Sequence, residues 1–158
     1  MRRKFFVDLY ELMKENKKII ALTGDLGYGG FDRIIEDFPD RYINCGAAEQ
    51  SMLDIAVGIA QSNKIPIVYS ITPFLLYRGF ETIRNYLSHE ETPVILIGAG
   101  RDRDYERLGF SHWAEEDHKV MSTLPNIECC WPDDKDRIRG ILENMIINKK
   151  PGYINLER

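Results

Sequence analysis

Hydrophobic residues in this chain form two patterns that alternate along its length. In the first, apolar residues recur three or four positions apart, which is typical of one face of an α-helix. In the second, they form a short continuous run, which is typical of a buried β-strand. The first pattern predicts helices at 5–13, 31–37, 52–60, 73–87, 114–123 and 138–145. The second predicts strands at 19–22, 42–45, 65–70, 94–97, 127–131 and 153–156.

Continuous apolar strands separated by helices indicate a mainly parallel sheet with helices on both faces. We therefore predict an α/β fold with three layers, α/β/α. The length of 158 residues suits one domain, covering 1–158, and no linker, internal repeat or low-complexity segment divides it.

Composition narrows the class of protein. Hydrophobic residues make up 44% and charged residues 29%, as in ordinary globular domains. The net charge of −4 argues against nucleic-acid binding, and no stretch is long enough to span a membrane or resembles a signal peptide. Cys45, Cys129 and Cys130 lack metal-ligand spacing, so we predict no metal site and free thiols in a reducing compartment. We expect a cytoplasmic protein.

Glu49 is the first candidate for chemistry, because it lies between a predicted strand and a predicted helix. A carboxylate in a first helical turn already has a structural explanation, since the helix dipole stabilises it by about 0.3–1 kcal/mol. The preceding residues 46–48 are Gly-Ala-Ala, however, and such small side chains let a flat ligand come close. A poorly solvated carboxyl group there could exchange a proton.

Other candidates follow further predicted strands, where ligands bind in open parallel sheets. Asp25 lies in the glycine-rich loop 23–30, which lacks the glycine order of a nucleotide-binding loop. Phe74, Tyr77 and Arg78 form an aromatic and polar cluster, although core packing explains most apolar residues around it.

Of the histidines, His89 and His118 fall on polar surfaces, where we expect them to be solvated. His112 ends a charged loop and is a candidate to polarise a hydroxyl or carbonyl group, although a lone histidine often only caps a helix. We expect the charges of 101–107 to be solvated and paired with one another.

Three segments resemble motifs of the transketolase family. Residues 44–52, NCGAAEQSM, resemble its N-x-G-I-A-E-Q-x-M signature. Residues 74–84 match F-x-x-x-R-[AG]-[YF]-[DE]-x-I-R, and residues 109–117 are similar to G-x-[ST]-H-Q-x-x-E-D. Shorter matches at Gly24-Asp25-Leu26, Pro125-Asn126 and Pro132-x-Asp134 extend the resemblance over nearly the whole chain.

The resemblance implies a domain that binds the aminopyrimidine of thiamine diphosphate. Glu49 would contact ring nitrogen N1′ and promote the imino tautomer, which takes the proton from thiazolium C2. Phe74 would stack on the aminopyrimidine with Tyr77 as its neighbour, and Asp25 would approach the thiazolium. His112 would contact the donor carbonyl of the substrate.

The resemblance also implies an incomplete active site. The family's diphosphate-binding domain, with its G-D-G and downstream asparagine, has no match here, and neither has its C-terminal domain. We therefore expect a subunit of a split enzyme that transfers a two-carbon ketol unit between sugars or sugar phosphates, with Arg78 and His112 binding the substrate. A second subunit would hold magnesium, and thiamine diphosphate would lie across the interface.

We further expect this chain to form a homodimer within a heterotetramer, with apolar residues near the site covered by protein, namely Met52, Leu76 and Tyr77. Two alternatives stay open: a small subunit of a thiamine diphosphate decarboxylase or lyase, and a non-catalytic regulatory subunit. Trp113 replaces the family's glutamine, and Leu108 stands where many members have an aspartate, so the substrates are undetermined.

Overall fold

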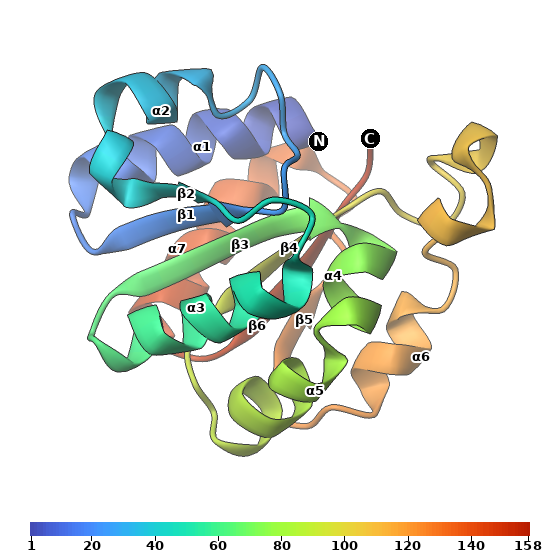
Figure 1. Ribbon diagram of the computed structural model, residues 1–158. Helices are drawn as coiled ribbons and strands as arrows, with labels where there is room; N and C mark the ends of the chain where they lie inside the picture. Colours follow the sequence, from blue (N-terminus) through green and yellow to red (C-terminus); the bar gives the residue numbers. More distant parts are fainter.

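A single six-stranded sheet forms the centre of the molecule (Figure 1), in the computed structural model, which describes all of residues 1–158. The strands are β1 (Ile19–Thr23), β2 (Tyr42–Asn44), β3 (Ile65–Ile71), β4 (Ile95–Ala99), β5 (Glu128–Cys130) and β6 (Gly152–Leu156). Their order across the sheet is β2-β1-β3-β4-β6-β5, and every neighbouring pair is parallel. The predicted α/β fold is confirmed.

Helices cover both faces of the sheet (Figure 1). One side, called the α1 face, carries α1 (Arg2–Glu15), α2 (Asp32–Asp37) and α7 (Ile138–Asn148). The other, called the α3 face, carries α3 (Glu49–Gln61), α4 (Thr72–Arg78), α5 (Phe80–Thr82), the π-helix η2 (Ile83–His89) and α6 (Asp117–Ser122). Short 3-10 turns complete the fold at η1 (Pro39–Arg41), η3 (Glu106–Leu108), η4 (Phe110–His112) and η5 (Lys135–Arg137). No helix is both long and apolar enough to cross a membrane.

Each face of the sheet buries its own hydrophobic cluster. Side chains of successive strand residues point to opposite faces, so adjacent residues enter different clusters. In β3, for example, Val68 packs in the α3-face cluster and Tyr69 in the α1-face cluster. The two faces at the end of this strand are therefore chemically independent.

Two predicted helices differ from the observed ones. The segment predicted as one helix at 73–87 is divided into α4, α5 and η2, with the first break at Gly79. The helix predicted at 114–123 begins only at Asp117, because Ala114 pairs with Asp102 in an isolated antiparallel bridge.

The expectation that Met52 and Leu76 are exposed is wrong. Their exposed fractions are 0% and 1%, because both point into the α3-face cluster. Tyr77 is 46% exposed, as expected of a residue available to a partner.

Gly79 marks a point where two helices touch too closely for a side chain. A Cβ at Gly79 would lie 1.9 Å from Cδ1 of Leu53, which is fully buried on α3. We predict that Gly79→Ala lowers the free energy of unfolding by about 1–3 kcal/mol through overpacking. The measurement is urea denaturation followed by circular dichroism.

Gly58→Ala is the matched control, because Gly58 lies on the exposed side of α3 with nothing within 4 Å of its Cβ position. Removing a glycine from a helix interior should raise stability by about 0.5–1 kcal/mol. Equal effects of the two substitutions would show that the contact with Leu53 is unimportant.

Candidate functional site

The candidate residues gather at the carboxyl ends of the strands, where parallel sheets bind ligands. The strand order reverses between β1 and β3, since β1 is followed by β2 on one side and β3 by β4 on the other. Such a reversal opens a crevice beyond the strand ends. Glu49 lies at this crevice, between the loop after β1 and the end of β3.

Glu49 is a buried carboxylate whose two oxygens each have a partner. Its side chain is 1% exposed. Ser70 Oγ donates a hydrogen bond to Oε1 at 3.0 Å, and Arg78 Nη1 lies 2.6 Å from Oε2. A Cβ at Gly24 would be 3.0 Å from Oε1, so glycine allows the close approach of the β1 loop. A carboxylate used only as a helix-end acid would not require this enclosure.

An aromatic group lies beside this carboxylate. The Arg78 guanidinium is 4.1 Å from the centre of the Phe74 ring. On its other side Phe74 meets His112 edge-on, with ring centres 4.9 Å apart. The structure thus brings together Glu49, Arg78, Phe74 and His112, which are separated by up to 63 positions in the sequence.

Asp25 marks the other end of the site. It has a left-handed backbone, with φ of 59°, and its NH and carboxylate both bond to the Asn44 side-chain amide at 3.0 Å. Because Asn44 ends β2, this pair joins the loops that follow two neighbouring strands. Asp25 is exposed at the carboxyl edge of the sheet.

Tyr77 points away from Glu49. Its hydroxyl donates to Glu116 Oε2 at 3.3 Å, beside the start of α6. Partial burial, together with the Glu116 carboxylate, raises the pKa of Tyr77 to about 12. The phenol therefore stays protonated and remains a hydrogen-bond donor throughout the physiological pH range.

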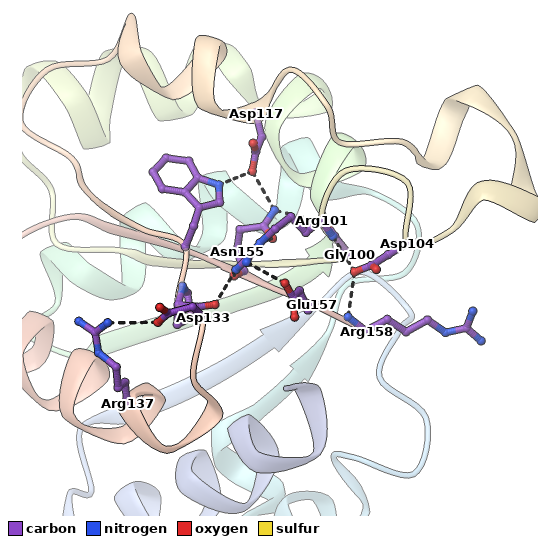
Figure 2. A network of polar contacts seen from close by, with 11 residues as sticks. Gly100, Arg101, Asp104, Asp117, Asp133, Arg137, Asn155, Glu157 and Arg158 are labelled. Atoms are coloured by element: carbon purple, nitrogen blue, oxygen red, sulfur yellow. Dashed lines mark hydrogen bonds and ion pairs between the residues drawn. The ribbon is translucent and has the colours of Figure 1, made fainter.

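A buried polar network, drawn in Figure 2, supports the His112 side of the site. The Asp117 carboxylate is 2% exposed as a residue, and its Oδ2 accepts hydrogen bonds from Trp131 Nε1, Tyr153 OH and Asn155 Nδ2 at 2.7–2.9 Å. Asn155 Nδ2 also donates to Thr72 Oγ1 and to the Gly100 carbonyl. Because Thr72 starts α4 and Gly100 follows β4, the network fixes both segments that lead to Phe74 and His112.

The charged loop is anchored, and the expectation of a solvated, self-paired surface is wrong. Arg101 has a side chain that is 16% exposed, bonds to the carbonyls of Pro132 and Asn155, and pairs with Glu157 (Figure 2). Arg103 pairs with Glu115 outside the run. His118 is exposed as expected, yet its ring stacks on Trp131 at 3.7 Å.

Sequence reasoning missed Ser70, Asn44 and Asn155. Ser70 is a polar residue in an apolar strand, and this contrast is the signal that could have identified it. Asn155 likewise interrupts the apolar run of β6, and it is fully buried. A polar residue in such a strand needs a hydrogen-bond partner, which here belongs to the site or to its support.

The fold and the site define a doubly wound α/β domain with a buried carboxylate at its ligand-binding edge. The sequence matches the family described as the transketolase pyrimidine-binding domain over residues 3–158, and the chain belongs to this family.

Related proteins agree with this assignment. The chain is 29% identical over 159 residues to a putative transketolase C-terminal section from Methanocaldococcus jannaschii, covering 100% of this chain and 50% of that protein. It is 28% identical to one subunit of the apulose-4-phosphate transketolase from Phocaeicola vulgatus, covering 99% and 51%. A solved structure of a split gene transketolase, described as an inactive beta4 tetramer, is 32% identical, with a TM-score of 0.86 and coverage of 99% and 51%. The chain thus spans about half the length of these relatives.

Asp117 offers a test of the supporting network. We predict that Asp117→Ala lowers the free energy of unfolding by about 3–5 kcal/mol, because three buried donors lose their acceptor. The measurement is urea denaturation. Asp133→Ala is the control, since the Asp133 side chain is 84% exposed and pairs only at the surface with Arg137, so its loss should change stability by less than about 1 kcal/mol. Similar losses in both variants would contradict the role given to the network.

Proposed function

We propose that this chain is the pyrimidine-binding subunit of a split transketolase-like enzyme that transfers a two-carbon ketol unit between sugars or sugar phosphates. The observation that carries the proposal is the enclosed Glu49 carboxylate beside the Phe74 ring. The relatives that this chain half covers support it, since one is named as a C-terminal section and another as a transketolase subunit.

The residues around Glu49 fit an aminopyrimidine ring. The Arg78 guanidinium is flat and cationic, lies over Phe74, and places an N–H donor on Glu49. A protonated ring nitrogen held against Glu49, in a ring stacked on Phe74, would use the same two contacts. The two residues therefore offer a carboxylate acceptor and an aromatic surface to one planar group, and stacking of this kind contributes about 0.5–1.5 kcal/mol beyond burial.

Thiamine diphosphate, when bound, supplies the carbanion chemistry that breaks and forms the bond to the two-carbon unit. Glu49 would hold a proton at ring nitrogen N1′, and its burial keeps water from competing for the carboxylate. Ser70 would keep Oε1 in place while Oε2 faces the ring. Phe74 would orient the ring, and Asp25 would approach the cofactor from the neighbouring loop.

Arg78 has a place in both states of the site. While it is paired with Glu49, it neutralises a buried negative charge. Once a ring nitrogen takes over the carboxylate, the guanidinium, whose side chain is 45% exposed, becomes available to the substrate. His112, in contact with Phe74, would handle the donor's oxygens, and Tyr77 would form part of the outer wall.

A second subunit would complete the site by holding the diphosphate and its magnesium. The Glu49 crevice lies at one edge of the sheet, so a flat ligand needs a second wall. We propose that two copies of this chain associate within a heterotetramer, with thiamine diphosphate across the interface between unlike subunits.

A thiamine diphosphate decarboxylase or lyase subunit is the rival enzyme, and a regulatory subunit is the rival without catalysis. The His112 segment, which resembles the transketolase motif and contacts Phe74, favours ketol transfer. The exposed Leu108 and the partly buried Trp113 leave the acceptor sugar open.

Glu49→Gln tests the catalytic role directly. We predict that the variant folds normally but slows exchange of the cofactor's C2 proton at least about a hundredfold in the complex with its partner, because an amide cannot share the proton at N1′. Proton exchange is measured by NMR after quenching. Glu81→Gln, at an exposed position on α5, is the control and should exchange at the normal rate. Unchanged exchange in Glu49→Gln would mean that Glu49 is only a helix-end acid.

The isolated chain should bind thiamine diphosphate weakly, because it supplies ring contacts and leaves the diphosphate to its partner. We expect titration calorimetry to give no magnesium-dependent binding by the chain alone, and tight magnesium-dependent binding after the partner is added. Tight binding by the chain without a partner would refute the split site.

A further inference from the structure

A large cavity opens on the α1 face, away from Glu49. Its volume is about 910 Å³, at the upper end of the usual range for small-molecule sites. It lies between the start of α1, the glycine-rich loop and the ends of β3 and β4. Tyr69 lines it, while the next residue, Ser70, bonds to Glu49 on the opposite face. The sheet itself therefore separates the two sites.

Every charged side chain that lines this cavity is an arginine, and the four are Arg2, Arg3, Arg33 and Arg158. None of them forms an ion pair, whereas the other half of the sheet edge pairs its arginines, Arg78 and Arg101, with carboxylates. Nearby carboxylates are engaged elsewhere: Asp37 accepts a hydrogen bond from Tyr10, and Asp104 accepts from the backbone of Arg101 and Arg158. The cavity therefore holds a concentrated, uncompensated positive charge.

Arg2 shows that a partner is missing inside the cavity. Its Nη1 donates to Tyr105 OH at 2.9 Å, but its Nε is buried and has no hydrogen-bond partner. A buried, unpaired donor on a charged group is costly, and an anion in the cavity would satisfy it.

The walls of the cavity are aromatic. Arg33 lies 4.0 Å from the centre of the Tyr10 ring, and Arg2 and Arg158 lie 5.8 and 5.7 Å from that of Tyr105. Tyr28, on the glycine-rich loop, is 82% exposed and has no aromatic or cationic neighbour. It presents a free ring face beside the arginines, on which a flat base can stack.

We propose that this cavity binds a phosphorylated ligand that carries an aromatic base, of the class of a nucleoside monophosphate. The arginines hold the phosphate, since a guanidinium donates two parallel hydrogen bonds to phosphate oxygens. The tyrosines hold the base. A sugar phosphate shares the phosphate chemistry but lacks the ring, so the two sources can be distinguished by affinity.

The experiment is titration calorimetry of the full chain with AMP, ribose 5-phosphate and adenosine. We expect AMP to bind at least tenfold more tightly than either of the others, because only AMP uses both the arginines and the rings. Arg33→Ala and Arg3→Ala, both at exposed positions, should each weaken AMP binding about tenfold, which corresponds to about 1.4 kcal/mol. Tyr28→Ala should weaken AMP and leave ribose 5-phosphate unchanged.

Two controls keep the sites apart. Arg137→Ala removes an exposed arginine far from the cavity lining, and Glu49→Gln alters the opposite face, so neither should change AMP binding more than twofold. Loss of AMP binding in Glu49→Gln with no effect of Arg33→Ala would place the nucleotide in the Glu49 site and overturn the proposal. Equal affinity for AMP and ribose 5-phosphate, or no AMP binding at millimolar concentration, would overturn it as well.

Discussion

The buried charge of Glu49 is the constraint on which this domain depends. An ionised carboxylate removed from water is strongly destabilising unless it is paired and hydrogen-bonded. Here α3 supplies the carboxylate, β3 supplies Ser70 and α4 supplies Arg78, so these three elements must meet in one arrangement. Gly24 lets the β1 loop close over the same group. A requirement of electrostatics thus fixes the geometry of the whole carboxyl edge around the switch point.

The hydrophobic pattern predicted all six strands and the main helices, because burial on both faces leaves a strong signal in the sequence. Glu49 and Phe74 could be selected because each follows a predicted strand. Ser70 could not, since its role depends on a contact 21 positions away. Met52 was misjudged for a similar reason: helical spacing shows that a residue lies on an apolar face, but only packing shows which side is covered.

The support for His112 was equally hidden from the sequence. Asp117 and Asn155 are 38 positions apart, and neither belongs to a local motif that predicts their contact. Their hydrogen bonds reach Thr72 at the start of α4 and Gly100 after β4, and so connect three strand ends (Figure 2). Residues of this kind carry no chemistry of their own, yet they set the distance between Phe74 and His112.

The place of β6 in the sheet has a consequence for biosynthesis. β6 lies between β4 and β5, and β5 pairs with no other strand. A nascent chain that has not yet extended past residue 152 therefore has β5 without a neighbour and β4 with a bare edge, and Asp117 lacks its donors Tyr153 and Asn155. An uncovered edge of a parallel sheet is a template for pairing with other chains. During translation, the ribosome-bound chain is exposed to aggregation until β6 emerges and inserts.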